Sequence, residues 1–334
     1  MKPAPVGHGR TPVGEQVATV VERLGVLVSA GVAPVQAWGH LAEVADDEFI
    51  SEVADEACRG VAVADAILQA LPRPSPTRTA SGRVRLGLRS ASAVDAWRAV
   101  AAAWFVAAES GAPMRLCLAD IAESLRQLGG VERDIAAALA GPAATARLVM
   151  VLPLVAVLGG SLIGLDSLGT LLGTPAGLTC LLIGLLLSGA GRWWSAQLLR
   201  RARRIDPTPG LALELVAVAV GGGGSLPAAR SLVGDALGRY GPTQPRHQPS
   251  GRSDPAERAV TAVLLLATRS GAPPALLLRS EATRIRRDAV GAAQQRAAAL
   301  GVWLMLPLGL CILPAFILLA VAPVLLGVLA VPPS

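Results

Sequence analysis

The sequence Ser-Gly-Ala-Pro at residues 110–113 decides the fold, because it recurs unchanged at residues 270–273. In each copy an Arg-Asp pair follows, then a Leu-Pro-Leu sequence, with 19 residues from the Asp to the Pro in both. A repeat with so long a period indicates a duplicated domain rather than a solenoid. Nothing in the repeated sequence is chemically reactive, which weakens the expectation of an enzyme.

Composition favours a helical protein that lies partly in a membrane. Hydrophobic residues make up 52% of the 334 residues and charged residues 16%, and the mean hydropathy is +0.53. The chain is too apolar for a typical soluble protein and too charged for one made mostly of membrane spans. Because Ala, Leu and Arg dominate and aromatic residues are only 3%, we expect an all-α fold.

Four short sequences, in which Pro follows Gly by two or three residues, are typical of the turn between two helices. Gly takes the left-handed conformation that ends one helix, and Pro suits the first turn of the next. Helices joined by so short a loop lie antiparallel, so the turns predict two hairpins in each of two modules. The turn residues are Gly31, Pro34, Gly111, Pro113, Gly224, Pro227, Gly271 and Pro273.

The two modules are expected to be antiparallel helical bundles. A flexible tail over residues 1–16 precedes the first module at 17–147, and the second module covers 192–299. Linkers rich in Pro, Ser and Gly interrupt the modules at about 71–85 and at about 241–255. Such composition is typical of extended or flexible connections between packed segments.

Three apolar segments are long enough to cross a bilayer, which takes roughly 20 residues of helix. The first two, at about 148–165 and 171–191, form a hairpin, and the third covers about 300–321. An apolar tail at 322–334 follows the third span. One span followed by this tail is favoured over two short spans, although Pro residues interrupt the run.

The arginines predict the orientation of the spans. Arginines precede the first and third apolar segments and follow the second, whereas the loop between the first two has none. The positive-inside rule therefore places both modules in the cytoplasm and the C-terminus outside a multi-pass cell-membrane protein. Because these flanks account for the formal net charge of +6, we expect no nucleic-acid partner.

The repeated Arg-Asp pairs, with the arginine before the second pair, are the candidate interaction residues. They precede apolar segments, so they are placed to contact a partner, the other module or anionic lipid headgroups. A solvated helix face below the membrane is the simpler interpretation. These residues are Arg133, Asp134, Arg286, Arg287 and Asp288.

The sequence predicts no catalytic residue, cofactor or metal. His40 has Glu43 one helical turn away, but this pair supplies too few ligands for a metal, so we interpret it as a surface contact. No Ser or Cys has an obvious His to activate it. The apolar segments lack the ionisable side chains that a transport pathway usually needs.

The layout resembles that of the type II secretion system F domain family, the inner-membrane platform proteins of type II secretion, type IV pili and Tad pili. The resemblance is strongest over residues 270–322, which include Leu-Met-Leu-Pro-Leu-Gly-Leu-Cys-Ile-Leu-Pro-Ala-Phe-Ile at 304–317, and it extends weakly over 17–325. The chain is most similar to the Tad pilus type of actinobacteria. It departs from that type because Tad systems usually divide the role between two shorter proteins.

The resemblance implies a non-catalytic platform that couples a hexameric secretion ATPase to the extraction of pilin subunits from the membrane. It also implies contact with lipids, self-association as a homo-oligomer, and a place for a second platform protein. From the residues alone, a polytopic transporter or enzyme and an unrelated membrane scaffold stay open as alternatives.

Overall fold

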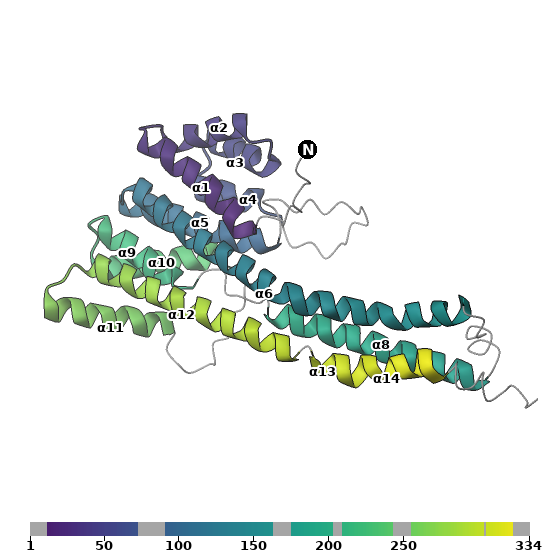
Figure 1. Ribbon diagram of the computed structural model, residues 1–334. Coiled ribbons are helices and arrows are strands. Elements are labelled where there is room, and N and C mark those ends of the chain that lie inside the picture. Colours follow the sequence, from purple (N-terminus) through teal and green to yellow (C-terminus); the bar gives the residue numbers. More distant parts are fainter. Residues whose placement is uncertain are drawn as a thin grey trace, which may run out of the picture. The chain divides into compact units, whose positions relative to one another are not determined.

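The computed structural model describes residues 12–72, 91–162, 175–202, 209–242, 255–303 and 305–322. Every secondary-structure element in these ranges is a helix, which confirms the expected all-α fold (Figure 1). Contacts divide the chain into two compact units. The helical unit comprises Met1–Glu132 and Asp206–Val290, and the apolar unit comprises Arg133–Ile205 and Gly291–Ser334.

The first part of the chain supplies six helices to the helical unit. They are α1 (Val13–Ser29), α2 (Pro34–Val44), α3 (Glu48–Cys58), α4 (Val63–Ala70), α5 (Ala91–Ser110) and the first part of α6 (Met114–Leu162). Helix α1 begins within the predicted flexible tail, and no predicted turn anticipates α3 and α4. Asp47 starts α3 by accepting a hydrogen bond from the backbone N–H of Phe49 at 2.8 Å, as an N-cap does.

Left-handed glycines stand at all four predicted turns, with one change of position. Gly31, Gly111 and Gly271 have φ angles of 88°, 67° and 68°. At the third turn the positive φ, 90°, belongs to Gly223 rather than to Gly224. Helix α9 ends at Gly221 and its C-cap is Gly222, so the position after the cap, where the left-handed residue belongs, falls on Gly223.

The prolines of these turns stand at or beside helix starts. Pro34 is the first residue of α2, and Pro227 is the second residue of α10. Pro113 and Pro273 each lie one residue before the next helix begins. In all four places Pro forfeits no helical hydrogen bond, because the first N–H groups of a helix have no partner within it.

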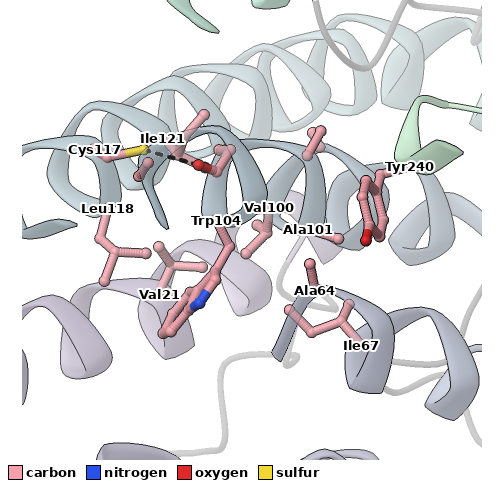
Figure 2. Close-up of a cluster of buried hydrophobic side chains, with 14 of the residues drawn as sticks. Val21, Ala64, Ile67, Val100, Ala101, Trp104, Cys117, Leu118, Ile121 and Tyr240 are labelled. Carbon is pink, nitrogen blue, oxygen red and sulfur yellow. Dashed lines mark hydrogen bonds between the residues drawn. The ribbon is translucent and has the colours of Figure 1, made fainter. Parts of the chain in front are cut away.

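Helix α5 lies at the centre of the helical unit. Ala99, Val100, Ala101, Ala102 and Ala103 are all buried, and four of these five consecutive side chains are small enough to let neighbouring helices approach on every side. Figure 2 shows α5 side chains between helices α1, α4 and α10. The buried apolar surface of α5 is therefore the main hydrophobic contact that orders this unit.

An aromatic cluster fixes α2 and α3 against α5. The rings of Trp38 and Trp97 lie 6.1 Å apart, and those of Phe49 and Trp97 lie 4.7 Å apart. All three side chains are fully buried. Tilted aromatic pairs at these distances are favourable beyond their burial alone.

Helices from the second part of the chain complete the same unit. They are α9 (Leu211–Gly221), α10 (Leu226–Tyr240), α11 (Pro255–Ser270) and the first part of α12 (Pro274–Trp303). Helices α9 and α10 pack against α5. The two sequence regions predicted as separate modules thus contribute to one compact unit, whose boundaries fall inside the unbroken helices α6 and α12 rather than at 147 and 299.

Two helix turns of this unit meet at a glycine. A Cβ atom added to Gly222 would overlap the carbonyl oxygen of Ser110 and lie 3.1 Å from the backbone nitrogen of Ala112. Because both neighbours are backbone atoms, they cannot rotate away as a side chain could. Gly222 therefore sets how closely the α9–α10 turn approaches the α5–α6 turn.

The apolar unit contains the second part of α6 and the later helices. These are α8 (Pro175–Ala202), the end of α12, α13 (Met305–Pro307), η1 (Leu308–Ile312), α14 (Leu313–Phe316) and η2 (Ile317–Val321), where η marks π-helical winding. Helix α8 packs along the segment from α13 to η2. A Cβ atom added to Gly184 would lie 2.5 Å from Cγ of Leu319, and one added to Gly191 would lie 3.1 Å from Cβ of Cys311, so these glycines allow the close approach.

Two described helices are long and apolar enough to cross a membrane, Gly177–Leu198 and Pro274–Leu319. They overlap the second and third predicted spans at 171–191 and 300–321. The first predicted span, at 148–165, lies on α6 as far as Leu162 and is not one of the two, and its remainder lies outside the described residues. The linkers predicted at about 71–85 and about 241–255, and the tail from residue 323, also fall largely outside them.

Candidate functional site

The structure separates Arg286 from the other predicted interaction residues. Arg133, Asp134, Arg287 and Asp288 are exposed, as a contact surface requires. Arg286 is only 4% exposed, so its assignment to a membrane-proximal or partner surface is wrong. It lies on the face of α12 that packs inside the helical unit, which the neighbouring charges in the sequence do not reveal.

Arg286 forms a buried ion pair with Glu214 of α9. One guanidinium nitrogen, Nη2, donates a hydrogen bond to Oε1 of Glu214. Burial lowers the pKa of Arg286, while the nearby carboxylates of Glu123 and Asp120 raise it. An arginine stays protonated at any physiological pH, so a full positive charge lies between α6, α9 and α12.

A second ion pair joins α6 and α12 close to the first. Nη2 of Arg279 lies 3.2 Å from Oδ2 of Asp120. Burial raises the pKa of the Asp120 carboxyl, and Arg279 and Arg286 lower it. The charges of Asp120 and Glu214 are therefore each opposed by an arginine of α12.

Asp65 of α4 links the first part of the chain to α10. The hydroxyl of Tyr240 donates to Oδ1 of Asp65 at 2.8 Å, and Nη2 of Arg239 lies 2.8 and 2.9 Å from its two oxygens. Burial, with the hydrogen bond to Asp65, raises the pKa of Tyr240 to about 12. We call the contacts of Asp65, Asp120 and Glu214 with Arg239, Tyr240, Arg279 and Arg286 the polar joint.

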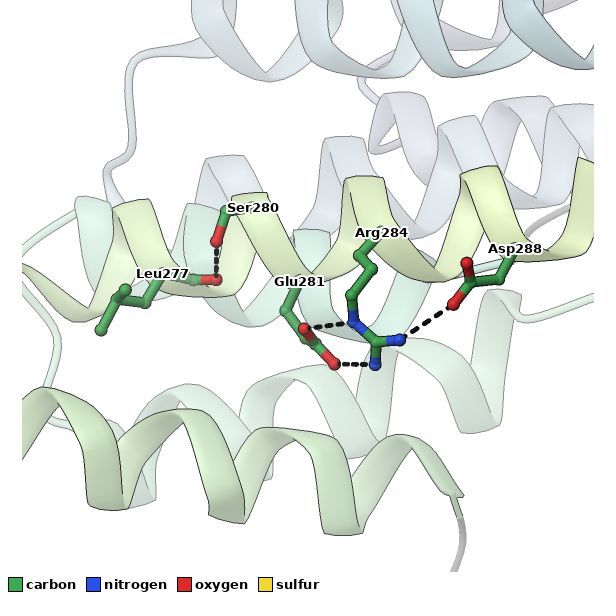
Figure 3. Close-up of polar contacts among 5 residues, drawn as sticks. All are labelled: Leu277, Ser280, Glu281, Arg284 and Asp288. Carbon is green, nitrogen blue, oxygen red and sulfur yellow. Dashed lines mark hydrogen bonds and ion pairs between the residues drawn. The ribbon is translucent and has the colours of Figure 1, made fainter.

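Three charged residues of α12 are paired along their own helix. Figure 3 shows Arg284 between Glu281 and Asp288, with Nε 2.9 Å from Oε2 of Glu281 and Nη1 2.9 Å from Oδ2 of Asp288. The hydrogen bond from Arg284 lowers the pKa of Glu281. Asp288 therefore pairs with Arg284 one turn earlier, and exposed pairs of this kind contribute little to stability.

Asp134 has a partner in the apolar unit. Its Oδ2 accepts a hydrogen bond from Nε2 of Gln294 at 3.5 Å, which links α6 to α12. The repeated Arg-Asp sequence thus makes different contacts in its two occurrences. His40 lies 3.7 Å from Glu43, and both side chains are exposed, as a surface contact requires.

The chemistry of the polar joint is that of helix packing. Cys117 lies near it with a buried thiol whose pKa is raised to about 12 by burial, and a thiol in that state is a poor nucleophile. Within the described residues, no group of three His, Cys, Asp or Glu side chains could hold a metal ion. The joint instead opposes each of its three acids with an arginine or tyrosine from a helix distant in the sequence, and Glu214 is the buried one of the three.

The sequence contains one signal for this joint. Glu214 stands inside the apolar run Leu-Ala-Leu-Glu-Leu-Val-Ala-Val-Ala-Val at residues 211–220. A charge within a helix that is buried on all sides needs a partner. Which arginine supplies it depends on the tertiary packing of α12, and the local sequence does not identify Arg286.

The described fold is all-α, and two of its helices are long and apolar enough to cross a membrane. Residues 20–160 match the family described as Type II secretion system (T2SS), protein F. The chain therefore carries a domain of the type II secretion system protein F family, a family of secretion and pilus platform proteins. No curated protein and no solved structure matches the chain.

The matched region differs from the one where we expected the strongest resemblance, residues 270–322. It covers most of α1, all of α2 to α5, and nearly all of α6. The first part of the chain holds α3 and α4 between α2 and α5. In the second part of the chain, only residues 241–254 lie between α10 and α11.

Proposed function

We propose that the chain is a non-catalytic inner-membrane platform of a type II secretion or Tad pilus machine. In this role it couples a hexameric cytoplasmic ATPase to the extraction of pilin subunits. The observation that carries the proposal is the family match over residues 20–160. The two helices long enough to cross a membrane support the location.

The proposed topology rests on arginine. Both sequence regions that build the helical unit adjoin apolar segments through arginine-rich flanks, so the positive-inside rule supports a cytoplasmic helical unit. The C-terminus then lies outside the membrane. The repeated Ser-Gly-Ala-Pro and Arg-Asp sequences support an origin by duplication.

The polar joint suits a part that transmits force. Close packing of apolar side chains resists displacement of the helices, and the buried ion pair adds to it because a buried charge without its partner is costly. The pairs Glu214–Arg286 and Asp120–Arg279 join α9 and α6 to α12. We therefore propose that the helical unit moves as one body when an ATPase acts on it.

The exposed pairs Arg133-Asp134 of the apolar unit and Arg287-Asp288 of the helical unit remain our proposed contact surfaces, one in each unit, for a protein partner or lipid headgroups. The test is co-purification of the detergent-solubilised full chain with the secretion ATPase of the same cells. Arg287→Glu should weaken recovery of the ATPase severalfold, because it reverses an exposed charge of the second pair.

Arg115→Glu is the matched control, since Arg115 is also exposed but lies at the start of α6, away from the proposed surfaces. It should leave recovery unchanged. Absence of the ATPase from preparations of the wild-type chain would contradict the coupling function itself. Equal recovery with Arg287→Glu would remove only that residue from the contact surface.

A further inference from the structure

Helices α5 and α11 have related sequences and end in the same turn. Arg-Ala-Val occurs at residues 98–100 of α5 and at 258–260 of α11, and nine residues separate it from Ser-Gly-Ala-Pro in each. The turn glycines have nearly equal φ angles, 67° and 68°. The two helices can therefore be compared position by position.

One stripe of α5 is covered by α10. Nη1 of Arg98 donates to the carbonyl oxygen that follows α10, at 2.9 Å, and the ring of Phe105 lies 5.2 Å from that of Tyr240. Ala102 and Val106 are fully buried. Residues at these intervals share one face of a helix, so α10 lies along this stripe.

The corresponding stripe of α11 is uncovered. It consists of Arg258, Ala262, Leu265 and Leu266, and all four residues are exposed. The exposed fractions of Leu265 and Leu266 are 52% and 55%. We call these four residues the α11 stripe.

Another row of positions is polar on α11 and apolar on α5. On α5, Trp97 packs on Phe49 of α3, and Ala101 lies beside α4 (Figure 2). The corresponding residues of α11 in the sequence are Glu257 and Thr261. The α11 stripe, by contrast, has kept its leucines.

We infer that the α11 stripe is the docking site for a helix of a second, different protein chain. The occupant is an amphipathic helix that resembles α10. A backbone carbonyl at its C-terminal end accepts a hydrogen bond from Arg258. The helix presents an aromatic or aliphatic side chain to Leu265 and Leu266. The contact between α10 and α5 is of this kind: Arg98 meets the carbonyl that follows α10, and Phe105 meets the ring of Tyr240.

Other occupants fit the stripe less well. The chain's own α10 already covers α5, and the same holds in a second copy. Residues 243–254 contain no aliphatic, Phe, Tyr or Trp residue that could cover the leucines. Residues 73–90 contain five arginines and no acid, so their charge would repel Arg258. A separate helical protein is therefore the occupant that matches both the apolar surface and the charge.

A peptide of α10 itself provides the probe, independently of any secretion function. Residues 226–242 would be synthesised with a hydrocarbon staple, because an isolated helix of this length is only marginally stable in water. A photoreactive benzophenone side chain would replace Tyr240. With the detergent-solubilised full chain, we expect saturable binding and cross-links to residues 258–269.

The double variant Leu265→Asp, Leu266→Asp should weaken binding about tenfold or more and abolish those cross-links. Arg258→Ala should weaken binding severalfold. Because Arg258 is exposed, this substitution disturbs the fold less, and the test stays decisive if the double variant folds poorly. The matched control is Leu276→Asp. Leu276 is 61% exposed, and its counterpart Leu116 is exposed as well, so its change should leave binding unaltered.

Several results would overturn the inference. They are the absence of saturable binding, cross-links confined to α5, unchanged affinity in the α11 stripe variants, or an equal loss with Leu276→Asp. Self-association of the full chain, measured by light scattering and lost in the Leu265 and Leu266 variant, would instead assign the stripe to a second copy.

Discussion

The guanidinium of Arg286 and the carboxylate of Glu214 form an ion pair inside the helical unit, although 72 residues separate them in the sequence. Their side chains are 5% and 11% exposed. Arg287, the next residue of α12, is exposed. Two adjacent arginines of one helix therefore have opposite roles, one within the fold and one at its surface.

Replacing Arg286 alone should destabilise the helical unit strongly. Arg286→Met leaves Glu214 buried without its partner, a defect that costs about 3–5 kcal/mol. At roughly 3 °C per kcal/mol for a domain of this size, the apparent melting temperature of the full chain in detergent, followed by tryptophan fluorescence, should fall by about 10 °C.

The neighbouring and double variants provide the controls. Arg287→Met should change the melting temperature by no more than about 2 °C, because exposed substitutions are usually within ~0.5 kcal/mol. Glu214→Leu combined with Arg286→Met should recover most of the loss, since it removes both buried charges. Equal effects of the two single arginine variants would contradict the burial of Arg286.

Gly222→Val should prevent the close approach of the α9–α10 and α5–α6 turns. The added side chain would meet backbone atoms of Ser110 and Ala112, so we expect a loss of about 3 kcal/mol or more, or failure to fold. The same thermal measurement checks this result.

Gly221→Ala is the matched control for Gly222. A Cβ atom on Gly221 meets nothing within 4 Å, and Ala is a better helix former than Gly by up to about 1 kcal/mol. It should be neutral or slightly stabilising. Tolerance of Val at residue 222 would show that the two turns do not touch.

Tyr240 is the only tyrosine of the chain, so its ionisation can be followed directly by near-ultraviolet absorbance. Its pKa should be close to 12 in the folded chain and about 10 in the unfolded chain. Because the folded pKa is raised, the stabilising effect is complete below pH ~10 and is lost as the pH rises through 12.

Asp65→Asn supplies the comparison for this titration. It removes the carboxylate that accepts the tyrosine proton in a hydrogen bond and opposes ionisation, so the midpoint should move down towards 10. A wild-type midpoint already near 10 would mean that Tyr240 is exposed and does not contact Asp65.

Gly191→Cys should form a disulfide with the native Cys311 under mild oxidation. A Cβ atom at Gly191 lies 3.1 Å from Cβ of Cys311, just below the separation of about 3.5–4.5 Å found in disulfides. The bond would be detected by mass spectrometry of the digested chain, in a background with Ala at Cys58, Cys117 and Cys180.

Gly189→Cys is the control, since a Cβ atom there meets nothing within 4 Å. It should give no bond to Cys311. Formation of the bond from residue 189 in preference to residue 191 would place a different face of α8 against the last helices.

The helix pattern could be predicted from sequence because its signals are local. Gly111 and Gly271 end helices through conformations that glycine adopts without strain, and the following prolines fit a helix start. The hairpin of α3 and α4 lacks the full signal, because Gly60, with a φ of 92°, is not followed by a proline. The third turn cannot be placed to the residue from sequence, because four consecutive glycines follow Val220.

The polar joint could not be predicted because its contacts are not local. Asp65 and Tyr240 are 175 residues apart, and no periodicity relates them. Arg286 and Arg287 look equivalent in sequence, and only the packing of α12 decides which one is buried. The charge of Glu214 in an apolar helix predicts that a partner exists, but the fold has to supply its identity.

Complementation of cells that lack this chain, with surface pili or secreted protein as the readout, tests the platform function directly. We expect that deletion abolishes the output, that the wild-type chain and the Gly221→Ala variant restore it, and that Gly222→Val does not. Normal output from the deletion strain would contradict a platform function for this protein.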